Sequence, residues 1–225
     1  MNEGSHSDSI VYVVDDDAPM RDALKELLES MGMRVDGFGS AAEFLKRASP
    51  DITSCLVLDV RLPGISGLDF QADLTKSNFR VPIIFISGHG DIPMTVRAMK
   101  AGAIEFLIKP IRDQDLLDAV QLALDKDRVR RQSERAVSNL RARYESLTPR
   151  EQQVIGLLTG GLMNKQIAAE MDVSEISVKV HRGNLMRKMG TKSLAELVRM
   201  VDLLGIRRSK SQVHRPARNF SASLI

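Results

Sequence analysis

The sequence predicts a doubly wound α/β domain of five βα units, followed by a long linker helix and an all-α domain of four helices. Two observations carry this prediction. Short runs of β-branched and aliphatic residues alternate with helix-like segments up to about residue 125. The charge then changes sign: residues 1–125 hold 12 Lys and Arg against 20 Asp and Glu, and residues 126–225 hold 20 against 9. The basic half favours a polyanionic partner, although a basic surface can also serve solubility alone.

Five segments of the first half have the composition of β-strands. Parallel strands need crossover connections, so the intervening helices should cover both faces of one sheet. The predicted strands are IVYVV (10–14), MRVDGF (33–38), SCLVL (54–58), VPIIFI (81–86) and IEFLI (104–108).

The linker is predicted from a segment that has neither Gly nor Pro between Ile111 and Leu147. Its almost wholly polar middle predicts a helical connector in solvent, and the sequence leaves open whether this connector is continuous with the last helix of the first domain. Apolar stripes flank this middle, first Leu116, Leu117, Val120 and Leu124, then Val137, Leu140, Tyr144 and Leu147. The second stripe fits either packing against the second domain or contact with a partner helix.

Helix signals are dense in the second domain. Thr148 is the expected N-cap of its first helix, with Pro149 as first helical residue and Glu151 completing a capping box. Gly160 and Gly161 should end that helix. Asn164 is the expected cap of a short second helix, Ser174 caps a third, and a fourth covers about 193–204.

These elements set the expected domain boundaries. We predict a disordered N-terminus (1–8), an α/β domain (9–125), a helical linker (126–145), a helical domain (146–206) and a disordered tail (207–225). The single cysteine, Cys55, fits a reducing compartment. No apolar run reaches the length of a membrane span and the polar start is no signal peptide, so we expect a cytoplasmic protein without a membrane partner.

Polar residues follow four of the five predicted strands. Asp15 and Asp16 end the first strand, Asp59 the third, Ser87 the fourth and Lys109 the fifth. In an open α/β sheet, ligands bind at the carboxyl ends of the strands, so these side chains should face one crevice. Helix capping is an alternative role for one aspartate among residues 15–17, but it does not account for all three.

Clustered carboxylates with an ammonium predict a site for Mg²⁺ and phosphoryl transfer. Asp16 and Asp59 are expected to bind Mg²⁺ directly, Asp15 through water, and Arg61 through its backbone carbonyl. Asp59 would accept the phosphoryl group. Lys109 would neutralise its oxygens and Ser87 would donate a hydrogen bond to it.

The motifs VVDDD, LVLDVRLPGISG, ISGHGD and FLIKP, in this order, resemble the receiver domain of two-component response regulators over about residues 9–125. The resemblance implies that Asp59 accepts phosphate from a sensor histidine kinase. It also implies that Ser87 and Phe106 form a switch and that the Lys109–Pro110 peptide is cis. A hydrolase of the haloacid dehalogenase type is the competing interpretation. It would need an aspartate two residues after the nucleophile, where this chain has Arg61, so we do not expect an enzyme.

In the second domain, two short helices joined by a tight turn predict a helix-turn-helix, whose second helix enters the major groove. An ordinary helical bundle is the alternative. In the third helix of the domain, Val178, His181, Leu185 and Met189 share one face and should pack inward. The opposite face, which should meet DNA, holds Lys179, Val180, Gly183 and Arg187.

The segment from LTPREQQVIGLL to GTKSLAEL resembles the LuxR-type helix-turn-helix of NarL/FixJ response regulators over about residues 146–205. The resemblance implies that Lys179, Val180 and Gly183 face the bases, although other members carry a longer side chain at position 183. The whole chain is most similar to FixJ-like activators, and also to regulators of styrene or toluene catabolism.

These inferences predict a phosphorylation-controlled transcription regulator, with an adaptor that never contacts DNA as a further alternative. The predicted partners are a sensor histidine kinase, promoter DNA and, as a candidate, RNA polymerase. The resemblance also implies that phosphorylation produces a homodimer through the helix that carries Val96 and Lys100.

Overall fold

The computed structural model describes residues 9–49, 51–77, 79–88 and 92–206. The disorder expected for 1–8 and 207–225 falls outside the described residues. The chain divides into two compact units, Met1–Gln132 and Ser133–Ile225. The division lies seven residues or so beyond the end expected for the α/β domain.

The first unit is a parallel five-stranded sheet, as the sequence predicts, and the structure gives its strand order as β2-β1-β3-β6-β7. Its strands are β1 (Ser9–Val14), β2 (Arg34–Phe38), β3 (Thr53–Asp59), β6 (Ile83–Ser87) and β7 (Glu105–Ile108). A short antiparallel pair, β4 (Arg61–Leu62) and β5 (Ile65–Ser66), follows β3 and was not expected.

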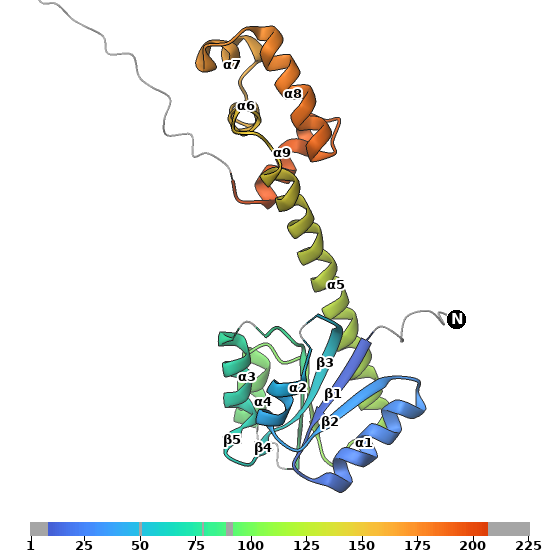
Figure 1. Ribbon diagram of the computed structural model, residues 1–225. Helices are drawn as coiled ribbons and strands as arrows, with labels where there is room; N and C mark the ends of the chain where they lie inside the picture. The colour runs from blue at the N-terminus through green and yellow to red at the C-terminus, as the bar shows by residue number, and fades with distance from the viewer. Residues whose placement is uncertain (1–8, 50, 78, 89–91, 207–225) are drawn as a thin grey trace, which may run out of the picture. The chain divides into compact units, whose positions relative to one another are not determined.

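Helices cover both faces of the sheet (Figure 1). They are α1 (Ala18–Ser30), α2 (Ala41–Arg47), α3 (Gly67–Lys76), α4 (Ile92–Lys100) and α5 (Asp113–Glu145). One core cluster joins α1 and α5 to one face, and it includes the buried Cys55 in the middle of β3. The other cluster joins α2, α3 and α4 to the opposite face and contains five of the phenylalanines.

Helix α5 is continuous over 33 residues, so the linker is an uninterrupted extension of the last helix of the α/β domain, a point that the sequence left open. Its first part packs on the sheet through Leu116, Val120 and Leu124. The second apolar stripe, from Val137 to Leu147, belongs to the core of the second unit. The stripe therefore has a partner within its own unit and does not present a free face for another helix.

The second unit contains, besides the end of α5, the helices α6 (Pro149–Thr159), α7 (Asn164–Met171), α8 (Glu175–Met189) and α9 (Leu194–Leu203). The Thr148 capping box is present, with the Thr148 and Glu151 side chains each accepting from the other's backbone N–H. Ser174 caps α8 as expected.

The prediction that Asn164 is the N-cap of α7 is wrong. Met163 occupies the N-cap position, and its backbone N–H donates to Oε1 of Gln166 at 2.8 Å. Asn164 is instead the first helical residue, and its Oδ1 accepts a hydrogen bond from Arg182. A long-range partner has therefore taken the side-chain oxygen that a local rule would assign to capping.

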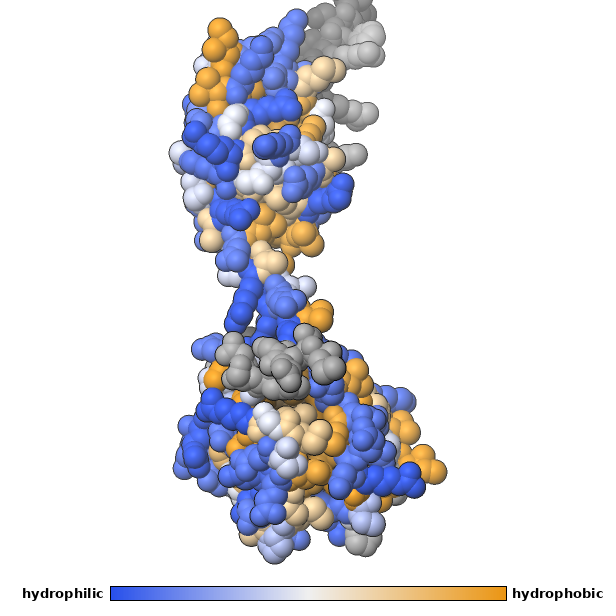
Figure 2. Space-filling view, turned by 90° about the vertical axis from the view of Figure 1, so that its right-hand side faces the viewer, coloured by the Kyte–Doolittle hydropathy of each residue, from blue (hydrophilic) through white to orange (hydrophobic). Residues whose placement is uncertain are grey.

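The surface of each unit is mostly hydrophilic on the face drawn in Figure 2, with separate apolar patches. None of the helices in the described ranges combines the length and apolarity that a membrane crossing requires.

Candidate functional site

The register of the sheet brings the polar strand ends to one edge. Asp15 and Asp59 each follow the last residue pair between β1 and β3, which joins Val14 to Leu58. Ser87 ends β6, and Lys109 follows the residue of β7 that pairs with it. Parallel strands place their carboxyl ends together, so side chains from positions far apart in the sequence meet in one crevice.

Lys109 binds two carboxylates at once. Its Nζ lies 2.8 Å from Oδ2 of Asp15 and 2.7 Å from Oδ2 of Asp59. The side chain of Asp15 is fully buried, and those of Asp59 and Lys109 are 10% and 17% exposed. Such a pair of charge-assisted hydrogen bonds in a largely desolvated place holds all three side chains in position.

Burial and charge oppose each other in this cluster. Burial raises the pKa of Asp15 above its ordinary value, and the hydrogen bonds from Lys109 and from the Asp17 backbone offset this only in part. Burial alone would lower the pKa of Lys109, but the hydrogen bonds and attraction of Asp15 and Asp59 together raise it. The crevice therefore keeps a charged ammonium and still has an excess of negative charge.

The carboxylates suit a hard divalent cation. Oxygen atoms of Asp15, Asp16 and Asp59 all lie within 4.8 Å of one another. Asp16 is exposed, so a bound ion would keep access to water, as Mg²⁺ prefers. Three carboxylates against one lysine leave a negative surplus that a dication would neutralise. Arg61 lies in β4 and donates its backbone N–H to Oδ1 of Asp59 at 2.9 Å, which orients that carboxylate.

The capping alternative applies to Asp17 by position only. Asp17 is the N-cap of α1, but its side chain makes no capping hydrogen bond. Its backbone N–H instead donates to Oδ1 of Asp15 at 2.9 Å. Asp15 and Asp16 lie before the cap and are left to form the acidic cluster.

The two expected switch residues lie on neighbouring strands. Ser87 is fully buried at the end of β6. Phe106 on β7 is 9% exposed, and its ring lies against Phe85 with 6.2 Å between centroids. The Lys109–Pro110 peptide is cis, as the resemblance implies.

Sequence reasoning missed Gly67, the first residue of α3. A Cβ atom at this position would lie 2.5 Å from the backbone oxygen of Asp59, much closer than Cβ contacts in proteins. The Gly67 N–H also donates to the carbonyl of Val60 at 2.9 Å. The backbone that carries Asp59 therefore rests directly on the start of α3, and only glycine allows this approach. The second glycine of the motif LPGISG was the available signal.

In the second unit, α8 presents two different faces. Val178, Leu185 and Met189 are fully buried, and His181 is partly buried, as expected for the inward face. The predicted DNA-contacting residues Lys179, Val180, Gly183 and Arg187 are all exposed. A left-handed Asp172 in the turn after α7 sets the direction of α8.

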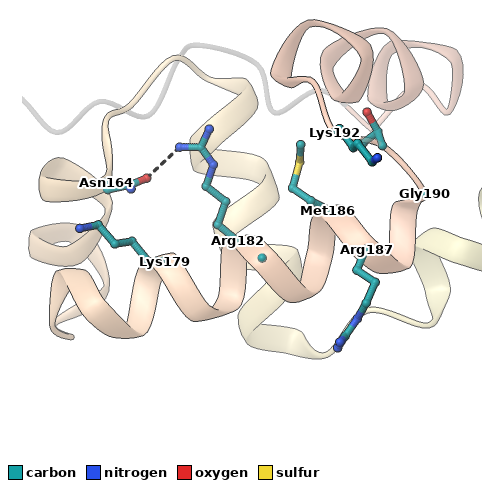
Figure 3. Close-up of a pocket in the computed structure, with 9 residues that line it drawn as sticks. Asn164, Lys179, Arg182, Met186, Arg187, Gly190 and Lys192 are labelled. Atoms are coloured by element: carbon teal, nitrogen blue, oxygen red, sulfur yellow. Dashed lines mark hydrogen bonds between the residues drawn. The ribbon is translucent and has the colours of Figure 1, made fainter.

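A groove of about 870 Å³ runs along one side of α8 (Figure 3). Four cationic residues, Lys179, Arg182, Arg187 and Lys192, contribute to its lining, and Arg182 donates to Asn164 at 3.2 Å. Figure 3 shows Arg182 and Met186 extending on one side of the helix and Arg187 on the other. Arg182 and Lys192 were not singled out from the sequence, because neither lies on the face opposite the core.

Comparison with known proteins identifies both units. Residues 11–121 match the response regulator receiver domain family, and residues 145–201 match the luxR family of bacterial regulatory proteins. Nodulation protein W of Bradyrhizobium diazoefficiens is 57% identical over 91% of this chain and 92% of its own. The chain belongs to the FixJ-like response regulators. The transcriptional regulatory protein FixJ of the same organism is 42% identical over 87% of this chain and 96% of its own.

A solved structure resembles this response regulator along most of its length. That of the response regulator StyR has a TM-score of 0.80 and 50% identity, covering 87% of this chain and 99% of that one. The expected similarity to FixJ is thus confirmed, and nodulation protein W adds a relative that the motifs did not suggest.

The family assignment fixes the general role of this response regulator. Its relatives are transcriptional regulators, its receiver domain implies a histidine kinase partner, and its luxR-family domain implies DNA binding. Receiver domains bind Mg²⁺ at an acidic pocket, and the carboxylate cluster of the first unit has the composition of one.

Proposed function

We propose that Asp59 accepts a phosphoryl group from a histidine kinase and that the phosphorylated protein dimerises and regulates transcription from specific promoter sites. The observation that carries this proposal is the ammonium of Lys109, held 2.7 Å from one oxygen of Asp59 and 2.8 Å from Asp15. A nucleophilic carboxylate beside a fixed cation and two further carboxylates suits phosphoryl transfer with Mg²⁺.

The residues that would hold Mg²⁺ are Asp16 and Asp59 directly, Asp15 through a water molecule, and the carbonyl of Arg61. When bound, the ion supplies positive charge that neutralises the phosphoryl oxygens. In the transfer, a carboxylate oxygen of Asp59 attacks phosphorus. The new P–O bond forms as the P–N bond to the kinase histidine breaks, and the imidazole keeps the electron pair. The hydrogen bond from the Arg61 N–H to Oδ1 holds the carboxylate in one orientation during this step.

After transfer, Lys109 would pair with a phosphoryl oxygen in place of the Asp59 oxygen that it now binds. Ser87 would move to donate a hydrogen bond to the phosphoryl group, and Phe106 would fill the space that Ser87 leaves. The buried position of Ser87 on β6 and the contact of Phe106 with Phe85 support this switch. In a closely packed interior, a movement of Ser87 would require the neighbouring side chains to rearrange.

The surface next to Phe106 supports dimerisation with a second copy of the chain. Val96 on α4 is 43% exposed, Met99 is 41% exposed and Ile108 at the end of β7 is 56% exposed. Lys100 is exposed on the same helix. A partly apolar surface with a charged rim fits a self-complementary interface, which a two-fold axis would complete.

DNA recognition would fall to α8. Lys179 and Val180 would face the bases, Arg187 would contact phosphate, and Gly183 would let the helix backbone approach the groove. Dimerisation would bring two such helices to adjacent half-sites in the cytoplasm, and RNA polymerase is the candidate partner of the bound dimer.

The experiment that tests the phosphoacceptor uses the full chain and acetyl phosphate, with intact mass as the readout. The wild type should gain one acid-labile phosphoryl group only when Mg²⁺ is present. Asp59→Asn should gain none, because the amide has the shape of the carboxylate but is a far weaker nucleophile. Asp73→Asn is the matched control, since this exposed aspartate of α3 lies outside the crevice and forms a surface ion pair with Lys76. Equal phosphorylation of Asp59→Asn and wild type would overturn the assignment.

A further inference from the structure

The face of α8 that points directly away from the core starts earlier than the sequence motifs indicate. With 3.6 residues per turn, the residues opposite the buried Val178, Leu185 and Met189 are those at i, i+4, i+7 and i+11 from position 176. This outer stripe consists of Ile176, Val180, Gly183 and Arg187. Ile176 therefore forms the N-terminal end of the face that would enter the major groove, although no motif singled it out.

The first half of the outer stripe is apolar and open to solvent. Ile176 is 73% exposed and Val180 is 56% exposed. At a spacing of i, i+4 their side chains are neighbours on the helix surface. Their exposure means that packing within the unit does not favour aliphatic side chains at these two positions. Helix propensity does not favour them either, because β-branched residues lose rotamer freedom in a helix.

The second half of the stripe changes character at Gly183. A Cβ atom at this position would meet no other atom within 4 Å, so the fold leaves room for a side chain. A glycine in a helix interior costs roughly 0.5–1 kcal/mol relative to alanine, and the packing around position 183 does not require one. The stripe therefore has two aliphatic side chains, then bare backbone, then the guanidinium of Arg187.

We infer that Ile176 and Val180 form a continuous apolar edge that reads thymine methyl groups, and that Ile176 is a specificity-determining residue of the half-site. The inference rests on the proposed role of α8 in DNA binding. Residues in the N-terminal part of a recognition helix contact base edges. In the major groove the thymine methyl is the apolar group that distinguishes one base from another, so two adjacent aliphatic side chains match thymine-containing steps.

Lys179 complements this edge. It follows Ile176 by three residues and precedes Gly183 by four, so its ammonium extends along the flank of the stripe, where Figure 3 shows it at the N-terminal end of the groove. A cation in that place suits the acceptors of guanine or a phosphate. We therefore expect thymines under Ile176 and Val180 with a guanine or phosphate contact beside them.

The test removes the methyl group without changing the base pairing. Binding sites are first selected from a random duplex pool with the full-length chain, treated with acetyl phosphate and Mg²⁺. Each thymine of the selected site is then replaced singly by deoxyuridine. Loss of one buried methyl should weaken wild-type binding about fourfold. The affinity of Ile176→Ala should not change on deoxyuridine substitution at one or more of the positions where the wild-type affinity falls. The affinity of Val180→Ala should likewise not change at the neighbouring positions.

Leu203→Ala is the matched control, because this aliphatic side chain of α9 is 68% exposed and lies outside the outer stripe. It should keep the full wild-type profile. If Ile176→Ala also keeps that profile on a selected site, the inference about Ile176 is wrong and the proposed function stands. If the phosphorylated chain selects no sequence at all, the proposed function is wrong, and the inference about Ile176 and Val180 is wrong as well.

Discussion

The buried carboxylate of Asp127, in the middle of α5, accepts a hydrogen bond of 3.0 Å from the backbone N–H of Ser54 at the start of β3. The same carboxylate forms ion pairs with Arg130 and Arg131 one turn further along the helix. Arg130 in turn donates to the carbonyl of Arg80 at 3.0 Å. This network fastens α5 to the sheet beyond the point where the sequence predicts that the linker begins.

Asp127→Ala should lower the free energy of unfolding of the receiver by roughly 3–5 kcal/mol, because it removes one member of a buried charged network and leaves the Ser54 N–H without its acceptor. Urea unfolding followed by circular dichroism measures the loss. Asp125→Ala is the control, since its pair with Arg128 lies at the surface and should contribute at most about 1 kcal/mol. Equal losses in the two variants would show that the Asp127 network does not stabilise the receiver.

Gly67→Ala should impair phosphorylation of Asp59 as well as stability. The added methyl would overlap the backbone oxygen of Asp59, so the chain must shift and carry the carboxylate with it. We expect a loss of roughly 1–3 kcal/mol in the free energy of unfolding and a slower gain of phosphate from acetyl phosphate. Gly156→Ala, where a Cβ atom would contact nothing, should instead be neutral or stabilising. Wild-type phosphorylation kinetics in Gly67→Ala would count against a positioning role.

Glu151 gives the second unit a stability that depends on pH. Burial alone would raise its pKa, but hydrogen bonds from Lys188 and Thr148 outweigh this and place the pKa below the ordinary value of 4.5. A carboxyl group with a lowered pKa stabilises the fold fully above its unfolded value, and the contribution is lost as the pH falls through the folded value. Glu151→Gln should therefore be less stable than wild type at pH 7, and this gap should narrow as the pH falls below 4.5.

The melting temperature of the wild type and of Glu151→Gln, measured from pH 7 down to pH 3, tests this dependence. Glu170→Gln is the control, because Glu170 is exposed on α7 and should give a difference from wild type that is small at every pH. A gap between Glu151→Gln and wild type that stays constant with pH would mean that the loss comes from packing and not from the ion pair with Lys188.

Val96→Asp should leave phosphorylation intact and prevent the dimer that we propose for the phosphorylated protein. Two copies related by a two-fold axis would bring two new carboxylates into one contact, where each would be desolvated near a like charge. Sedimentation of the phosphorylated variant measures the effect. Val129→Asp, on the exposed face of α5, is the matched control and should dimerise as the wild type does. A Val96→Asp dimer as tight as that of the wild type would place the interface elsewhere.

The sequence predicts those parts of the fold that depend on local rules. The capping box of Thr148 and Glu151 needs only two residues three positions apart, and the parallel pairing of the sheet follows from repeated βα units. The prediction that Asn164 caps α7 was wrong because the side-chain oxygen of Asn164 accepts a hydrogen bond from Arg182, 18 positions away. A local sequence pattern does not predict which residues distant in the sequence form hydrogen bonds with one another.

The candidate site shows the same division. Asp15, Asp59 and Lys109 were predicted to meet because parallel strands align their ends, and the structure brings them within hydrogen-bonding distance. Gly67 and Asp127 were not found, since their importance depends on a backbone contact and on a pairing over 73 positions. The motif LPGISG offered a signal for Gly67, whereas the residues beside Asp127 carry no sign of its contact with Ser54.

Cys55 makes the opening of the receiver measurable in the unaltered chain. It is the single cysteine of the sequence, it is fully buried in β3, and burial raises the pKa of its thiol far above the ordinary value. An exposed thiolate attacks iodoacetamide and displaces iodide, so the reagent should react only with molecules whose sheet has come apart. The rate of alkylation then reports how often the first unit opens, with no signal from the second, and comparing it with and without phosphate on Asp59 measures how far modification at the crevice tightens the sheet beneath it.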